Sequence, residues 1–295
     1  MTVYRKSIAE HIFDGGNAIL LLFLGAATLY PIIHVIAASL SNADQLMSHQ
    51  GPLLFPLGLQ WEAYRLVLNN PNIGTGFRNT LFIVVFGTIL NVFMTAMGAY
   101  VLSRKQVYWN KILMLLIVFT MYFSGGLIPT YLLVYKTLHL KNSLFALIIP
   151  GMISTWNLII MRTSFKQIPD SLLESAKIDG ANDFGLLFRI VIPLSMPILS
   201  VMILFYGVGH WNAWFNAMLY LRERQLFPLQ LILREILIQN NTDSMMTGVG
   251  SLDKQSVSES IKYATIVVAT FPILVIYPFL QRYFVKGVMI GALKE

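Results

Sequence analysis

The sequence predicts an all-α membrane protein that crosses the bilayer six times. Of the 295 residues, 56% are hydrophobic and only 12% are charged, and the mean hydropathy is +0.65. A soluble domain carries about 25% charged residues, so a chain this apolar is expected to lie mostly in lipid. Six of its apolar segments are close to the roughly 20 residues that an α-helix needs to cross the hydrocarbon core.

The six expected spans cover residues 18–40, 81–102, 112–135, 144–161, 198–219 and 263–280. Breaks are expected in the fourth span, at Pro150, Gly151, Trp156 and Asn157, and in the sixth, at Pro272 and Pro278. Such breaks are tolerated in lipid where neighbouring helices cover the freed backbone groups. The pattern therefore favours a packed bundle over isolated helices.

Basic residues predict the orientation of the chain. Arg104, Lys105, Lys111 and Arg162 lie directly beside span ends, on the same side as the amino terminus. Because such residues gather on the cytoplasmic side, both termini are expected there. The tail 282–295 and the segment 162–192 are then cytoplasmic, and the long loop 221–261 is extracellular.

Several function classes are disfavoured by the sequence. No Asp, Glu, Lys or Arg lies within the six segments, whereas transporters driven by an ion gradient usually carry an ionisable or ion-coordinating group there. The chain has no cysteine and its five histidines are scattered, so no metal site and no catalytic residue is predicted. The net charge of +7 is spread too evenly for a nucleic-acid-binding stripe.

The segment 162–192 is expected to form a helix, a tight turn and a second helix. Ser171 and Glu174 have the spacing of a capping box, which predicts a helix over 171–178. Asp179-Gly180 then breaks this helix, because glycine accepts the positive φ of a sharp turn. Asn182 or Asp183 is expected to cap the second helix.

Apolar side chains on this pair of helices predict a docking surface. One face of the second helix is expected to carry Phe184, Leu187, Phe188 and Val191, and Leu172 and Leu173 lie on the first helix. Exposed together in water, such side chains would promote aggregation unless a partner covered them. The alternative is an interfacial helix pair that lies on the inner leaflet.

The same segment carries a family resemblance. The run from Glu174 to Ala181, reading ESAKIDGA, with Phe188, Ile192-Pro193 and Pro197 downstream, resembles the EAA loop of permeases in binding-protein-dependent ABC importers. Ser175 stands where the family usually has alanine. In that family the loop is a coupling helix that enters a groove on a cytoplasmic ATPase subunit. The resemblance assigns ATPase coupling to Glu174, Ser175, Ala176, Asp179, Gly180, Ala181 and Phe188, within the type I ABC importer permease fold.

Further short motifs narrow the resemblance. Trp61-Glu62-Ala63-Tyr64, Asn79-Thr80, the run Trp211 to Phe215, and Pro228-Leu229-Gln230 look like maltose-type carbohydrate permeases, and most like those for complex plant or polyuronate oligosaccharides. The resemblance implies a bacterial cytoplasmic-membrane assembly with a second, different but homologous permease, two ATPase subunits and an extracellular solute-binding protein. It also implies that the loop 221–261 meets the binding protein and that the tail reaches between the ATPases.

No nucleotide site is predicted in this chain, because the sequence has no G-x-x-x-x-G-K-[ST] run. The chain is therefore expected to be a transport subunit and not an enzyme, and to bind no cofactor of its own. ATP and Mg²⁺ would bind to the partner ATPase subunits.

A sugar path needs hydrogen-bonding groups and aromatic faces at the depth of the spans. The candidates are Asn91, Tyr122, Trp156, Asn157, Tyr206, Trp211, Asn212, Trp214 and Asn216. Each has a structural alternative, because Trp and Tyr often anchor span ends and Asn often joins helices. The prediction is a permease that passes an oligosaccharide inward by alternating access. Another small hydrophilic solute, or a stand-alone secondary transporter, are the alternatives.

Overall fold

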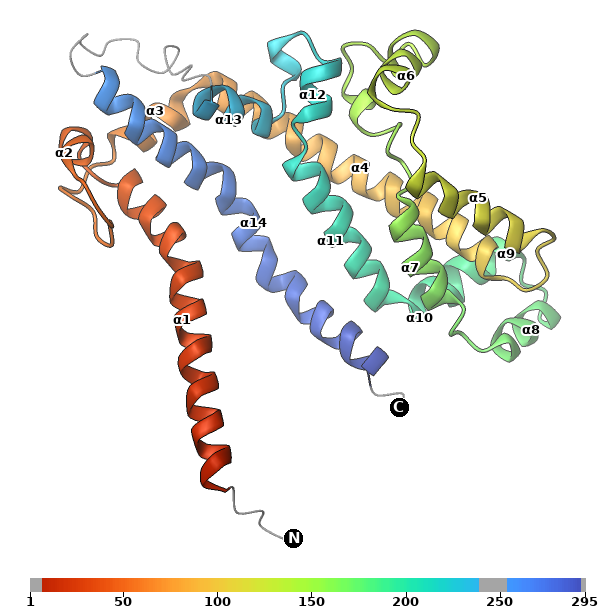
Figure 1. The fold of residues 1–295 in the computed structure, drawn as a ribbon. Helices are drawn as coiled ribbons and strands as arrows, with labels where there is room; N and C mark the ends of the chain where they lie inside the picture. The colour runs from red at the N-terminus through yellow and green to blue at the C-terminus, as the bar shows by residue number, and fades with distance from the viewer. Residues whose placement is uncertain (1–6, 239–253, 293–295) are drawn as a thin grey trace. The chain divides into compact units, whose positions relative to one another are not determined.

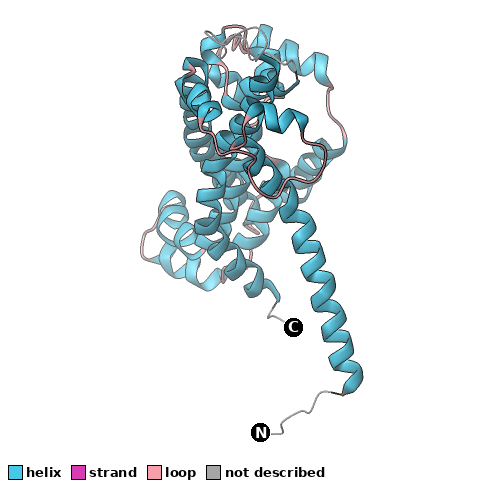
Figure 2. Ribbon diagram, turned by 90° about the vertical axis from the view of Figure 1, so that its left-hand side faces the viewer, coloured by secondary structure: helices cyan, strands magenta, loops and turns pink. Residues whose placement is uncertain are grey.

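The computed structural model describes residues 7–238 and 254–292, and within these two stretches the chain is helical without a β-strand (Figures 1 and 2). One isolated bridge joins Ser41 to Leu59. The chain divides into two compact units, Met1–Asn70 with Ile236–Thr270, and Pro71–Glu235 with Phe271–Glu295. The all-α prediction is confirmed for the described residues.

The first unit begins with the long apolar helix α1 (Ile8–Ser39). Ser7 and Glu10 form a capping box at its start, in which the Ser7 hydroxyl accepts from the Glu10 N–H and the Glu10 carboxylate accepts from the Ser7 N–H. The short helices α2 (Ala43–Ser48) and α3 (Glu62–Asn69) follow. Ala37 and Ala38 at the end of α1 are buried with Leu53, and Tyr263 packs against them.

The second unit is built around α4 (Pro71–Ser103), α7 (Thr155–Phe165) and α11 (Met196–Asn212), which lie side by side in Figure 1. Their facing side chains form its main hydrophobic core, including Ala99, Met161 and Met202, all nearly inaccessible to solvent. After α11 the chain continues through α12 (Phe215–Tyr220), η4 (Arg224–Leu226) and α13 (Leu229–Ile238), and the last residues of α13 belong to the first unit.

Among residues 7–238 and 254–292, three helices are long and apolar enough to cross a membrane, and up to five spans result if each bent pair counts as one. The first, second and sixth expected spans lie in α1, α4 and α14 (Lys254–Ala292). Helix α14 continues through Pro272 and Pro278, so the breaks expected there are wrong; membrane helices tolerate proline where neighbouring groups satisfy the freed backbone. The third is divided between α5 (Asn110–Tyr122) and the pair α6 (Leu127–Leu132) and η1 (Leu133–Thr137), with a bend of 109°. The count of six stays a prediction.

The fourth and fifth expected spans differ from continuous helices. The fourth contains the short 3-10 turn η2 (Leu144–Leu147) and then α7, which begins only at Thr155 after the break at Pro150 and Gly151. Trp156 and Asn157 lie in the first turn of α7, so the interruption expected at these two residues is wrong. The Ser154 hydroxyl caps α7 by accepting from the Asn157 N–H at 3.4 Å. The fifth ends at Asn212, because Ala213 and Trp214 separate α11 from α12.

Two glycines on α4 provide a matched test of its packing against α13. A β-carbon added at Gly76 would lie 2.5 Å from Ile232 Cδ1 and 3.2 Å from the backbone Cα of Leu229, whereas one added at Gly74 meets nothing within 4 Å. We expect Gly76→Ala to destabilise the chain by about 1–3 kcal/mol through overpacking. Gly74→Ala should be neutral or slightly stabilising, since alanine favours helix.

The measurement is the thermal unfolding midpoint of each purified variant in the same detergent. Equal midpoints for the two variants would show that α4 does not approach α13 this closely.

Candidate functional site

The segment 162–192 has the expected helix–turn–helix structure. Helix α8 (Asp170–Ile178) ends in a Schellman motif, in which the Ala181 N–H donates to the Ala176 carbonyl and the Gly180 N–H to the Lys177 carbonyl. Gly180 has φ +85°, a conformation that side chains with a β-carbon rarely adopt. Helix α9 (Asp183–Leu186) follows directly and continues through η3 (Leu187–Val191) and α10 (Ile192–Leu194).

The two predicted caps have different outcomes. The prediction of a capping box formed by Ser171 and Glu174 is wrong. Helix α8 begins one residue earlier, at Asp170, and its N-cap Pro169 makes no side-chain capping bond. Proline there fixes an extended entry into the helix, which places Ser171 inside the first turn. At the second helix the Asn182 prediction is confirmed, since Asn182 Oδ1 accepts from the Gly185 N–H at 2.7 Å.

The inner side of this loop is part of the main core. Leu173, Leu186, Leu187 and Val191 are buried in the same cluster as side chains of α4, α7 and α11. The predicted exposure of Leu173 is therefore wrong. The predicted apolar face was also partly wrong, because Leu186 is buried while Phe184 and Phe188 are exposed; the π-helical turn η3 changes the helical register at this point.

The outer side of the loop is both apolar and polar. Leu172, Ile178 and Phe184 are 47%, 86% and 61% exposed. Of the predicted coupling residues, Glu174, Ser175, Asp179, Gly180 and Phe188 are exposed, while Ala176 and Ala181 are half-buried and pack against the core. Five of the seven predicted coupling residues are thus exposed, and the other two fix the segment against the bundle.

Polar contacts attach the loop to the end of α4. Tyr100 donates its hydroxyl hydrogen to Asp183 Oδ1 at 3.2 Å, and Lys105 Nζ donates to Asp170 Oδ2 at 2.8 Å. The hydrogen bond and charge of Lys105 lower the pKa of Asp170, and Asp170 in turn raises the pKa of Lys105. This exposed ion pair therefore keeps both charges at neutral pH, at the point where α8 begins.

Four of the candidate path residues are buried within the bundle: Asn91, Asn157, Tyr206 and Trp211. Asn91 Nδ2 donates to the carbonyl oxygens of Gly151 and Met152, both at 2.9 Å, and Asn91 Oδ1 lies 2.8 Å from His210 Nε2. Tyr206 accepts from the Ser154 N–H and lies 2.7 Å from Thr95 Oγ1. These two side chains join α4 and α11 to the broken segment before α7.

The other five path candidates are exposed: Tyr122, Trp156, Asn212, Trp214 and Asn216. Asn212 Nδ2 donates to the Val208 carbonyl of its own helix, and the Arg234 guanidinium lies over the Trp214 ring at 4.8 Å. The structure therefore places the nine candidates in two groups, one inside the bundle and one on its surface.

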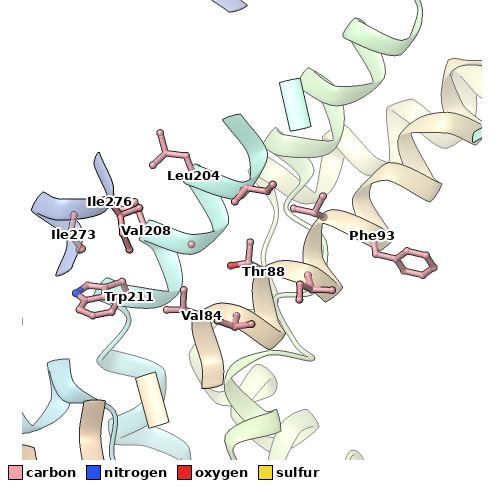
Figure 3. Close-up of a pocket in the computed structure, with 13 residues that line it drawn as sticks. Val84, Thr88, Phe93, Leu204, Val208, Trp211, Ile273 and Ile276 are labelled. Atoms are coloured by element: carbon pink, nitrogen blue, oxygen red, sulfur yellow. The ribbon is translucent and has the colours of Figure 1, made fainter. Parts of the chain in front are cut away.

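A cavity of about 520 Å³ lies between α4, α11 and the part of α14 that belongs to the same unit (Figure 3). Of the nine path candidates, Trp211 lines it, beside Thr88, Val84 and Ile273. Its walls are almost wholly apolar. The sequence could not predict this cavity, because valine and isoleucine within a membrane span are equally common in a packed core. Thr88 Oγ1 and Trp211 Nε1 are buried and have no hydrogen-bond partner within residues 7–238 and 254–292.

The fold and the loop together define a multi-pass helical membrane protein whose two-helix loop packs against the bundle on one side and exposes apolar and polar side chains on the other. Residues 96–290 match the family described as binding-protein-dependent transport system inner membrane component. The chain belongs to this family, and it is a membrane component of an ABC transporter.

Relatives and a solved structure support the assignment along the whole chain. A polygalacturonan/rhamnogalacturonan transport system permease protein of Bacillus subtilis is 42% identical, over 93% of this chain and 95% of that protein. An arabinooligosaccharides transport system permease protein of B. subtilis is 27% identical, over 98% and 99%. A chain of a bacterial ABC transporter involved in the import of the acidic polysaccharide alginate has a TM-score of 0.87 and 31% identity, over 96% of this chain and 100% of that chain.

The Asn91 bonds generate a stability prediction. Asn91→Ala leaves the Gly151 and Met152 carbonyls without their donor in an apolar setting, so we expect a loss of about 1–3 kcal/mol. Asn212→Ala removes only an exposed contact within α11 and should change stability by about 0.5 kcal/mol or less. Denaturant or thermal unfolding of both purified variants measures the difference. A similar small effect for both would mean that Asn91 does not support the helix break.

Proposed function

We propose that this chain is the permease subunit that passes an oligosaccharide into the cell by alternating access, driven by separate ATPase subunits. The observation that carries the proposal is the loop α8–α9, which exposes Leu172, Ile178 and Phe184 while its buried side shares one core with α4, α7 and α11. A partner that moves this loop would move the bundle with it, because a packed core transmits displacement.

The coupling residues fit the docking of an ATPase. Glu174 and Asp179 are exposed on the same segment as the apolar side chains Leu172 and Ile178, and are proposed to make polar contacts with that subunit. Gly180 permits the turn that presents them, and Ala176 and Ala181 hold the turn against the bundle. The exposed carboxylates and the fixed turn support the proposal that this segment is the EAA coupling helix of a type I importer.

The proposed topology has six spans, with both termini in the cytoplasm and a cytoplasmic coupling loop at 162–192. The positions of Arg104, Lys105, Lys111 and Arg162 beside helix ends support it. The extracellular loop 221–261 would meet the solute-binding protein, although residues 239–253 lie outside the described residues. The cytoplasmic tail 282–295 would reach the ATPases; α14 continues to Ala292, and residues 293–295 lie outside the described residues.

The proposed assembly contains a second, homologous permease chain, two ATPase subunits and an extracellular solute-binding protein in the bacterial cytoplasmic membrane. ATP and Mg²⁺ are assigned to the ATPase subunits. The lack of a phosphate-binding glycine run in this sequence supports that assignment. In the described ranges 7–238 and 254–292, no group of three acidic or histidine side chains is placed to hold a metal ion.

The proposed substrate is an oligosaccharide, and an acidic one in particular. The names of the relatives support this class, since they include transporters of polygalacturonan and of alginate. We assign solute contact to the exposed candidates Tyr122, Trp156, Asn212, Trp214 and Asn216. The buried candidates Asn91, Asn157, Tyr206 and Trp211 then position the helices that border the path.

Reconstitution tests this function. We expect uptake of a labelled galacturonate oligosaccharide into proteoliposomes only when the second permease, the ATPases, the binding protein and ATP are all present. A stand-alone transporter would retain uptake without nucleotide or partner chains. Uptake by this chain alone would therefore contradict the proposal.

Two loop variants test the coupling role. Gly180→Val forces a β-branched residue to φ +85°, and Glu174→Ala removes an exposed carboxylate without touching the core. Both should abolish ATP-driven uptake and weaken co-purification of the ATPase, while the membrane fold stays intact. Gln167→Ala, exposed and outside the motif, is the matched control and should keep both properties. Normal uptake by Gly180→Val and Glu174→Ala with the ATPase still attached would refute the coupling role.

A further inference from the structure

A second cavity, of about 350 Å³, lies between the end of α4 and the loop α8–α9. Its lining residues are Met97, Tyr100, Val101, Arg104, Gln106, Val107, Lys177, Asp183, Phe184 and Leu187. The charged ones are two cations, Arg104 and Lys177, and one carboxylate, Asp183. Because Asp183 already accepts the hydrogen bond of Tyr100 and lies 3.8 Å from Lys177, one positive charge in the cavity is left uncompensated.

Arg104 is the group whose partner is absent. Its Nε and Nη2 atoms are buried and make no hydrogen bond within the described part of the chain, residues 7–238 and 254–292. These two nitrogens form one edge of the guanidinium, the edge that binds a carboxylate or phosphate through two parallel bonds. The guanidinium lies over the Tyr100 ring at 4.6 Å, which supports its position but satisfies neither N–H.

The backbone around Arg104 is fixed rather than loose. Asn110 Nδ2 donates to the carbonyl oxygens of Leu102 and Arg104, both at 2.9 Å. Arg162 donates to the Leu102 carbonyl and to Asn110 Oδ1. The cation is thus held at the end of α4 by bonds that do not involve its own charge.

The other lining residues identify the kind of anion. Met97, Val101, Val107, Phe184 and Leu187 give the cavity an apolar half directly beside the cations. Tyr108 and Trp109, which follow the lining residue Val107 in the chain, are 87% and 66% exposed. Aromatic residues at the end of a span mark the depth of the lipid headgroups. An anion held at this depth beside apolar side chains has the chemistry of a phospholipid, with a phosphate next to acyl chains.

We propose that this cavity binds the phosphate of an anionic phospholipid, which accepts hydrogen bonds from Arg104 and neutralises its charge, with Lys177 as a second cation in the same lining, while the acyl chains lie against the apolar side chains. The assignment to the cytoplasmic leaflet rests on the proposed function. Since the cavity is bordered by α4 on one side and by Lys177 and Phe184 of the coupling loop on the other, the bound lipid strengthens the joint between loop and bundle. Leu172 and Ile178 do not line the cavity and stay free for the ATPase.

The test measures the phospholipid retained by the full importer, purified after reconstitution in phosphatidylcholine with or without phosphatidylglycerol and analysed by native mass spectrometry. Arg104→Gln should lower retained phosphatidylglycerol about tenfold, because charge-assisted bonds are lost. Lys111→Gln removes an exposed charge at the start of α5 that does not line the cavity, so it should retain lipid as the wild type does. Lys177→Gln should act in the same direction as Arg104→Gln.

Equal retention by Arg104→Gln and wild type, at equal unfolding midpoints, would overturn the proposal. It would also be overturned if inorganic phosphate bound the wild type in phosphatidylcholine alone while phosphatidylglycerol was not retained. Detachment of the ATPase from Arg104→Gln with unchanged lipid would show that an acidic side chain of that subunit is the partner instead. ATP-driven uptake by the wild type is measured alongside and separates the lipid site from the proposed function. Uptake without retained lipid refutes the lipid site alone. Retention that depends on Arg104, without uptake, refutes the proposed function alone.

Discussion

The structure of the second unit depends on the side-chain amide of Asn91. At Pro150 and Gly151 the backbone leaves the helical path in an apolar setting, and each freed carbonyl there is costly without a donor. Asn91 supplies donors to the Gly151 and Met152 carbonyls and meets His210 of α11 with its oxygen. One side chain on α4 therefore fixes the break before α7 and holds α11 beside it. Gly87 makes room for this contact, since a β-carbon there would lie 2.7 Å from His210 Nε2.

The same helix also packs against the loop α8–α9. Below Asn91, α4 contributes Ala96, Ala99 and Tyr100 to the core that also buries Leu173 and Leu186 of the loop. Near its end it holds the loop through the Tyr100–Asp183 hydrogen bond, and just after its end the chain adds the Lys105–Asp170 ion pair. In our account a displacement applied at α8 is carried along α4 to the helix break and to α11. Under the proposed function, this route would let a bundle with no charged residue in its expected spans be driven by a partner outside the membrane.

Much of this was predictable from the sequence, because composition, span length and the Asp-Gly turn are local properties. The two-helix loop, the Asn182 cap and the positive φ of Gly180 all followed from residue types at fixed spacing. The errors came from tertiary context. Asp170, where α8 begins, is paired with Lys105, which lies 65 positions away, and the register change at η3 is a π-helical turn that no sequence period indicates. The roles of Asn91 and Arg104 also required the structure, since the carbonyls, neighbours and cavity around them come from distant segments.

The most direct test of the account is the accessibility of position 178 in the working importer. The chain has no cysteine, so Ile178→Cys introduces its single thiol at the most exposed apolar side chain of the loop. We predict rapid maleimide labelling of this thiol in the permease pair alone and strong protection once the ATPase is bound, with labelling that changes when ATP is added. Equal labelling of that thiol with and without the ATPase, in an assembly that still imports solute, would contradict the account.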